Sequence, residues 1–311
     1  MYKRQLLIGC ASAVFNLARQ SYLTEAVPLA MRARAMSTLG GSMRIGVFVG
    51  PFLGAASMGF FGLDGAYGVA LVVTVLAGIL AYRVPDLEAR QARGTGAPAV
   101  SLRSMVADHW RVFVTLGTGV LLLSAVRATR QVVIPLWAAH AGLDPTTSSI
   151  IYGIAGGIDM LMFYPAGKVM DRQGRRWVAV PCMLIMGASM VLLPLTTTII
   201  PIALVSMLMG FGNGIGSGIV MTLGADTSPA VGRPIFLSLW REIADAGAGI
   251  GPVILSAVTA ISTLAIGIMV SGGVGFAAAL ALWRWIPARV AAEPSAVAEP
   301  VPLGDAPDAR A

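Results

Sequence analysis

The sequence predicts an all-α membrane protein with nine transmembrane helices. Apolar residues make up 56% of its 311 positions and charged residues only 12%, about half the charged fraction of soluble domains. A soluble fold of this size could not bury so much apolar surface, which excludes soluble enzymes, nucleic-acid binders and disordered proteins. The apolar residues form runs as long as a membrane helix needs, about 20 residues. Only helices satisfy their own backbone in lipid along such runs.

The nine predicted segments follow one another with short connections. They cover residues 6–27, 38–60, 64–82, 112–138, 147–167, 177–195, 200–223, 236–262 and 264–286. The 37 glycines and 16 methionines of the chain suit close packing between helices in lipid. We therefore expect a helical bundle whose backbone contacts are made through small residues.

Basic residues alternate between connections and thereby orient the helices. The connections after the first, third, fifth and seventh segments and the C-terminal flank carry Arg32, Arg34, Arg83, Arg90, Arg93, Arg103, Arg111, Lys168, Arg172, Arg175, Arg176, Arg233, Arg284 and Arg289. The opposite connections carry no Lys or Arg. By the positive-inside rule the basic side is cytoplasmic and the N-terminus lies outside. The net charge of +7 then needs no nucleic acid, and we expect a multi-pass protein of a bacterial inner membrane.

An internal repeat relates two parts of the chain at an offset of 201 residues. It aligns Glu25-x-x-Pro28-x-x-x-Arg32 with Asp226-x-x-Pro229-x-x-x-Arg233, and Gly46-x-x-x-Gly50-Pro51 with Gly247-x-x-x-Gly251-Pro252. Repeated halves are typical of secondary transporters, which bind substrate between the halves near the membrane midplane. The predicted regions are 1–82 as the remainder of a first half, 83–111 as a cytoplasmic linker, 112–287 as a six-helix second half and 288–311 as a disordered cytoplasmic tail.

Two motifs resemble signatures of the major facilitator superfamily of twelve-helix carriers. Residues 167–176, Gly-Lys-Val-Met-Asp-Arg-Gln-Gly-Arg-Arg, resemble its loop signature, and residues 46–54 resemble the G-x-x-x-G-P-x-x-G signature of its fifth helix. The resemblance covers residues 6–286 as family helices four to twelve. It implies that the chain is N-terminally truncated and lacks three helices, the alternative being a genuine short form. Gln5 stands where the family's fourth-helix pattern has an arginine.

The resemblance also implies roles for residues of these motifs. In the family the loop stabilises one facing of the carrier, a role carried over to Gly167, Asp171, Arg172, Gly174, Arg175 and Arg176. A cytoplasmic charge network is expected from Glu25, Arg32, Asp226 and Arg233. The small residues and prolines that we expect to let helices approach closely or bend are Gly46, Gly50, Pro51, Gly54, Gly247, Gly251 and Pro252. The fifth-helix signature is associated with antiporters, especially drug–proton exporters.

Charged side chains inside the predicted segments are candidate pathway residues, because charge is costly in a membrane. They are Arg19, Arg44, Arg127, Arg130, Asp159, Arg241, Glu242 and Asp245. Arg44 and Asp159 each lie about eight residues, or roughly 12 Å, from an expected cytoplasmic helix end. A bridge between them would join the two halves, and protonation of Asp159 would weaken it. The alternatives are a static bridge, or an Asp159 that faces water.

The other charges leave alternatives open. Arg127 and Arg130 share a helix face and either attract an anionic substrate, bond carbonyls near Pro135 or extend toward the interface. Arg241 and Asp245 either neutralise each other at i, i+4 spacing or, with Glu242, serve proton transfer. Weaker cavity candidates are Asn16, Gln131, Trp137, Tyr152 and Asn213.

The sequence favours a secondary active transporter that exports small organic or amphipathic compounds in exchange for protons. An uptake carrier for organic anions and a transport-incompetent fragment of a carrier are the alternatives. The sequence has no cluster of histidine, acidic and serine residues that would suggest a membrane enzyme. Neither His109 nor His140 has a partner at the spacing of metal ligands. Cys10 and Cys182 give no disulfide framework. The expected partners are the bilayer, a small-molecule substrate and protons, with no cofactor, metal or nucleic acid.

Overall fold

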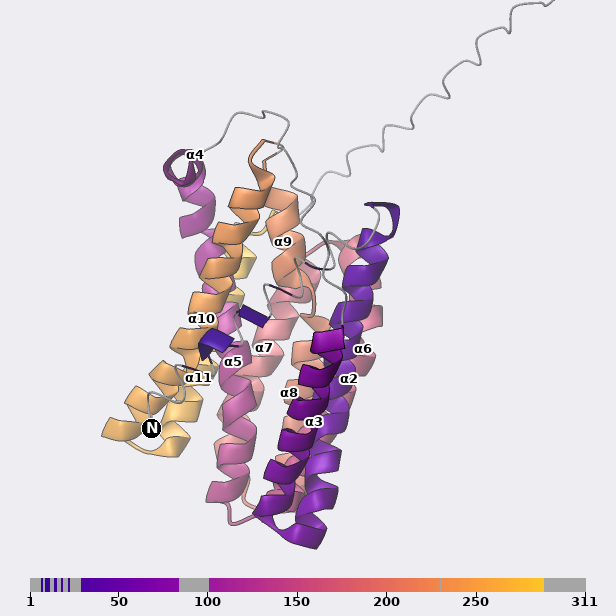
Figure 1. Ribbon diagram of the computed structural model, residues 1–311. Coiled ribbons are helices and arrows are strands. Elements are labelled where there is room, and N and C mark those ends of the chain that lie inside the picture. The colour runs from indigo at the N-terminus through magenta and orange to yellow at the C-terminus, as the bar shows by residue number, and fades with distance from the viewer. Residues whose placement is uncertain are drawn as a thin grey trace, which may run out of the picture.

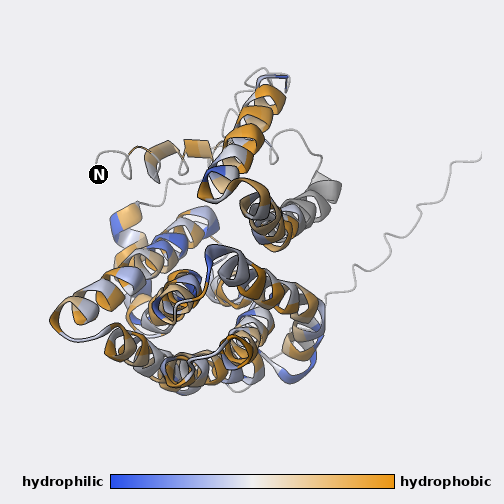
Figure 2. Cartoon of the chain, turned by 90° about the horizontal axis from the view of Figure 1, so that it is seen from below, coloured by the Kyte–Doolittle hydropathy of each residue, from blue (hydrophilic) through white to orange (hydrophobic). Residues whose placement is uncertain are grey.

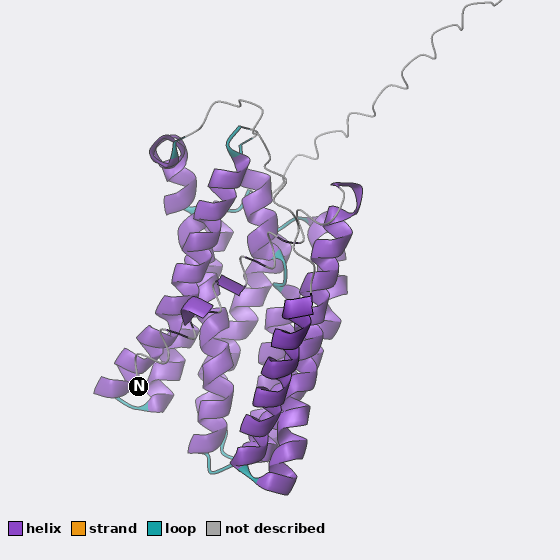
Figure 3. Ribbon diagram, in the orientation of Figure 1, coloured by secondary structure: helices purple, strands orange, loops and turns teal. Residues whose placement is uncertain are grey.

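A computed structural model describes residues 29–83, 101–229 and 231–287, together with scattered positions before residue 29. These residues are helical apart from short turns, and none of them lies in a strand (Figure 3). The predicted all-α class is therefore confirmed. The predicted tail 288–311 lies outside the described residues, as does most of the first predicted segment, 6–27.

The helices form an elongated bundle (Figure 1). They are α2 (Leu29–Phe61), α3 (Leu63–Arg83), α4 (Leu102–Val114), α5 (Leu116–His140), α6 (Pro145–Gln173), α7 (Arg176–Leu192), η1 (Leu193–Leu195), α8 (Ile199–Ile215), α9 (Ile219–Thr227), α10 (Arg233–Ile261) and α11 (Leu264–Trp285). Within the described ranges, six segments are long and apolar enough to cross a membrane: α3, α5, α7 with η1, α8 with α9, α10 and α11. A seventh is α6, bent by 41° between Met162 and Tyr164, next to Pro165, which removes a backbone donor.

The remaining predicted segment, 38–60, falls within α2, whose apolar part is the shorter Ile45–Phe61. The described residues thus give six or seven clear membrane spans, and the count of nine stays a prediction.

The internal repeat reappears as matching helices. Shifting α2 by 201 residues gives 230–262, close to the bounds of α10, and shifting α3 gives 264–284, close to the bounds of α11. Pro51 lies inside α2 as Pro252 lies inside α10. The helix bounds therefore follow the same offset as the sequence repeat, and α2 and α10 also share an internal proline.

The connections that carry no Lys or Arg lie at one end of the bundle, and the segments with basic residues lie at the other end. The α2–α3, α5–α6 and α10–α11 connections are at the lower end of Figure 1, and α4 and the start of α10 are at the upper end. The predicted linker 83–111 contains part of α4, which Ser101 caps by accepting from the amide of Ser104. Phe113 of α4 stacks on Phe236 of α10 at 5.0 Å, and the ring of His109, in the linker part of α4, lies 5.6 Å from the same ring. Helix α4 is therefore packed against α10.

Seen along the helix axes, hydrophobic residues cover much of the outside of the helices (Figure 2), as lipid contact requires. The interior of the second half contains flexible thioethers: Met183, Met186, Met190 and Met209 are fully buried. Methionine fills irregular gaps between helices, and here it does so beside buried aromatic side chains such as Phe236 and Trp240.

Glycines set the closest helix contacts of the second half. A Cβ added at Gly251 would meet the Thr129 hydroxyl at 2.6 Å and the carbonyl carbon of Ala125 at 2.8 Å. Gly247 likewise faces the backbone of Leu121, so α10 crosses α5 at backbone contact. A Cβ at Gly46, Gly50 or Gly54 would meet no described atom within 4 Å, and a packing role for them stays a prediction.

The contact between the predicted halves runs between α2 and α6. A Cβ added at Gly153 would lie only 2.8 Å from Cε2 of Phe52. A Cβ added at Gly157 would lie 2.8 Å from Cε2 of Phe48. Two aromatic side chains of α2 therefore fit into two small positions of α6. Gly157, the nearer of these two positions of the α2–α6 seam, lies within one turn of Asp159.

Candidate functional site

Four polar side chains meet in the middle of the bundle, and we call them the polar cluster: Arg127, Arg130, Asp159 and Asn213. The two arginines come from α5, Asp159 is the middle residue of α6, and Asn213 is the middle residue of the α8–α9 span. The side chains of Arg130 and Asp159 are 5% and 18% exposed. Charge at this depth is costly in a membrane unless it is paired.

Asn213 joins the cluster into one chain of contacts. Oδ2 of Asp159 accepts from Nδ2 of Asn213 at 2.7 Å and from Nη1 of Arg130 at 3.3 Å. Oδ1 of Asn213 accepts from Nε of Arg127 at 2.7 Å. Nε of Arg130 is buried and has no partner among the described residues. With two arginines for one carboxylate, the cluster carries an excess positive charge.

Arg127 also closes a break in a membrane-spanning helix. Between α8 and α9 the chain turns at Gly218, whose φ of 82° favours glycine. Here the amide of Ser217 donates to Gly214 O, so Asn213 O loses the donor of a regular helix. Nη2 of Arg127 lies 3.5 Å from Asn213 O, and Nη1 lies 3.4 Å from Gly216 O. The guanidinium thus supplies donors to carbonyls that lipid could not satisfy.

The structure shows two partners of Asp159 that the sequence did not predict. Helix α6 continues past Gly167 to Gln173, so Asp159 is about 21 Å from the helix end that is predicted to be cytoplasmic, rather than 12 Å. Arg44 is equally deep in α2, but its side chain lies outside the described residues, and a bridge to it stays a prediction. The partners that the structure does show are Arg130 and Asn213.

A cavity of about 230 Å³ opens next to the cluster, between α2 of the first half and α5 and α6 of the second. Its lining residues are Pro51, Gln131, Pro135, Ser148, Ser149 and Tyr152. Gln131 and Tyr152 were expected to line a cavity. Trp137 has a packing role instead, since its indole is buried and donates to Thr196 O at 3.1 Å.

On α10, Nε of Arg241 lies 3.0 Å from both carboxylate oxygens of Asp245. This is the predicted i, i+4 pair, and both side chains are more than half exposed. Glu242 is exposed beside them. A charged stripe on a membrane helix requires water or protein next to it, and a role of these residues in proton transfer stays a proposal.

The predicted loop motif is a helix end and a tight turn. Gly167, Asp171 and Arg172 belong to α6, Gly174 ends that helix with a φ of 99°, and Arg175 precedes α7. Glycine is required at Gly174 because other residues are strained in that conformation. The side chain of Asp171 lies outside the described residues, so its proposed contact with helix-terminal amides is untested.

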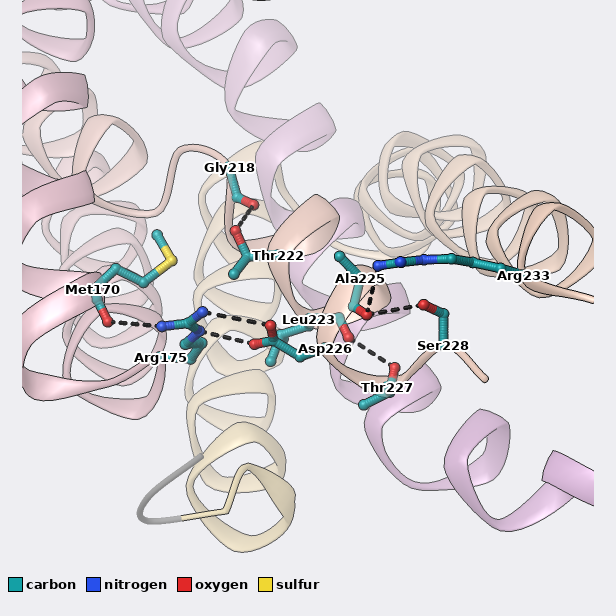
Figure 4. A network of polar contacts seen from close by, with 10 residues as sticks. All are labelled: Met170, Arg175, Gly218, Thr222, Leu223, Ala225, Asp226, Thr227, Ser228 and Arg233. Atoms are coloured by element: carbon teal, nitrogen blue, oxygen red, sulfur yellow. Dashed lines mark hydrogen bonds and ion pairs between the residues drawn. The ribbon is translucent and has the colours of Figure 1, made fainter. Parts of the chain in front are cut away.

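Asp226 and Arg233 are the described members of the predicted cytoplasmic charge network, and Arg175 of the loop motif binds Asp226 (Figure 4). Nε of Arg175 lies 2.8 Å from Oδ2 of Asp226, at the end of α9, and its Nη1 donates to Met170 O. Nη2 of Arg233 donates to Ala225 O at 3.3 Å. Arg176 instead covers the ring of Trp283 at 3.6 Å. Arg172 is exposed.

Several candidates lie outside the described residues, wholly or with their side chains: Asn16, Arg19, Glu25 and Arg32.

We expect Arg175 and Asp226 to stabilise each other by about 1 kcal/mol, because both side chains are only about one-fifth exposed. A double-mutant cycle of Arg175→Ala and Asp226→Ala measured by thermal unfolding gives this coupling. The exposed pair Arg241 and Asp245 is the control and should couple more weakly. Equal coupling in both pairs would contradict the assignment.

Sequence reasoning underestimated Asn213 and overlooked the helix break. The available signal was the run of glycines at 210, 212, 214, 216 and 218, which weakens a helix at mid-span. Among the described residues no group of His, Cys, Asp and Glu side chains is placed to hold a metal.

A protein-family model described as Major Facilitator Superfamily matches residues 5–229 and, in a second alignment, residues 116–307. The two alignments overlap between 116 and 229, as expected when the halves of a family are related by a repeat. A search of curated proteins found no match.

Proposed function

The chain belongs to the Major Facilitator Superfamily, and on this premise we propose that it exports small organic, amphipathic compounds in exchange for protons. The observation that carries the proposal is the pair of Asp159 and Arg130 at the middle of membrane-spanning helices. A carboxylate in a membrane helix is costly and typical of proton relays. The contacts around Asp159 support a role in proton exchange rather than a purely structural ion pair.

The position of Asp159 supports coupling between protonation and rocking of the halves. Gly157, two residues earlier, receives Phe48 of α2 across the seam. When Asp159 takes up a proton, Arg130 loses its counter-ion and the cluster must rearrange next to that seam. Alternating access in carriers of this kind is largely a rocking of one half against the other. The cavity between α2, α5 and α6 is then the candidate substrate entrance.

Uptake of organic anions is the second candidate function. The cluster has two guanidinium groups for one carboxylate, and Nε of Arg130 has no partner among the described residues. A planar carboxylate of a substrate fits such a donor. This reading predicts inward movement of the substrate together with protons, opposite to that of the exporter.

A flux assay separates the two candidates. Purified protein in proteoliposomes is given a pH gradient of either sign, with ethidium as the amphipathic cation and benzoate as the organic anion. We expect ethidium to move against the proton flow and to stop moving when an ionophore collapses the gradient. Benzoate moving with the protons would favour the second candidate. Flux of both probes that ignores the gradient would contradict proton coupling.

A further inference from the structure

The break between α8 and α9 presents a set of oxygens in a membrane interior. Asn213 contributes Oδ1 and its carbonyl, and Gly216 contributes a second carbonyl. The carbonyls are at the C-terminal end of α8, where the helix dipole is negative. Unwound carbonyls and helix C-terminal ends are the groups with which carriers hold cations at mid-membrane.

The guanidinium group of Arg127 lies among these oxygens. Nε, Nη1 and Nη2 of Arg127 point at three different oxygens, at 2.7, 3.4 and 3.5 Å. A guanidinium stays charged at every physiological pH and offers donors in a planar fork. Arg127 therefore provides a permanent monovalent charge at the break and cannot dissociate.

On the side of α7 the break packs against apolar side chains. Gly216 faces Cys182 of α7, which is fully buried, and Gly212 faces Ile185 and Met186. Carbonyls left without a donor in such apolar surroundings are costly. The site thus requires a cation or a strong donor in every state that keeps the break.

We propose that the α8–α9 break is a monovalent-cation site whose resident cation is the guanidinium of Arg127. The vacated site takes a guanidinium ion from solution, and the unmodified carrier needs no exchangeable sodium ion. The second statement rests on the proposed transport activity and refines it, because it leaves the proton at Asp159 as the coupling ion. The first statement concerns binding alone.

The direct test is chemical rescue of Arg127→Ala by millimolar guanidinium chloride. In proteoliposomes the variant is expected to lose at least about nine-tenths of its flux, and guanidinium should restore a large part. Sodium, the spherical alternative, should restore less. Arg111→Ala, which removes an exposed cytoplasmic arginine, is the control and should not respond to guanidinium.

A binding measurement keeps the test independent of transport. Guanidinium should raise the Tm of Arg127→Ala by a saturable shift, whereas the same concentration should not raise the Tm of the unmodified chain. If the variant folds poorly, guanidinium during expression and purification should increase its yield, and Arg127→Gln provides a second host. An unshifted Tm and an unchanged yield would overturn the cation site.

The sodium statement has its own control. Replacing sodium by choline should leave the flux of the unmodified chain unchanged, and sodium-dependent flux would overturn this part. Failure of the proposed export itself appears separately, as absent gradient-driven flux in the unmodified chain while the Tm shift of Arg127→Ala persists.

Discussion

Replacing Asp159 by Asn is expected to lower pH-gradient-driven export at least about tenfold. The amide keeps the shape of the carboxyl group but cannot release a proton, and it leaves Arg130 without its counter-ion. Exchange of labelled for unlabelled substrate without a gradient requires no net proton movement, and we expect it to survive. The ratio of the two rates in proteoliposomes therefore reports coupling rather than folding.

The matched control is Asp144→Asn. Asp144 caps α6 outside the membrane by accepting from the hydroxyl and the amide of Thr147. These bonds, the side-chain bond first, hold the pKa of its carboxyl below the ordinary value. Its cap is thus strongest above the ordinary pKa and weakens only as pH falls through the lowered pKa. Asparagine also caps helices well, so this variant should keep its coupling. An Asp159→Asn carrier with unaltered gradient dependence would refute the coupling role.

Stability provides a further check on the same pair. Removing one member of a buried ion pair costs about 3–5 kcal/mol, because it leaves an uncompensated charge. The double variant Asp159→Asn with Arg130→Gln removes both charges and is expected to recover part of the lost Tm. It should not recover coupling, since no proton-binding group returns. Recovery of coupling without Asp159 would place the proton site elsewhere.

The helices of the fold were largely predictable because each predicted property is local. Long apolar runs and alternating basic connections need only chain order. The offset of 201 residues, found in the second and eighth predicted segments, places α2 close to the bounds of α10. The tertiary contacts of the glycines were not predictable in the same way. Gly50 and Gly251 share one motif, yet only Gly251 faces a neighbouring backbone among the described residues.

The sequence singled out Arg127, Arg130 and Asp159 as charged residues in membrane segments, but it did not predict which side chains they contact. Depth along a helix was counted from Gly167, although α6 continues for six further residues, and depth alone does not say which neighbour faces a side chain. The short connection between α5 and α6 is the stronger signal. It makes them an antiparallel hairpin and brings Arg130 within reach of Asp159. The role of Asn213 depends on where a helix breaks, which glycine composition indicates only roughly.

Gly251→Leu is expected to be the most destabilising of the single changes considered for helix packing. A side chain there must displace Thr129 and the backbone of Ala125, and two packed helices cannot separate locally without losing their other contacts. Overpacking of this kind costs about 1–3 kcal/mol, occasionally more. We expect a clear fall in Tm or loss of folded protein in detergent, measured by thermal unfolding and size-exclusion chromatography.

The repeat supplies the control, because Gly50 occupies the equivalent position of α2 and a Cβ there meets no described atom within 4 Å. Gly50→Leu should therefore be tolerated. The alanine variants are more discriminating, since alanine favours a helix over glycine by about 1 kcal/mol. At Gly50 no described atom opposes this gain and Tm should hold or rise, whereas at Gly251 the clash outweighs it and Tm should fall. Opposite signs at two repeat-related glycines would show that tertiary contact, and not the shared motif, decides the need for glycine. Equal responses would contradict the backbone contact between α5 and α10.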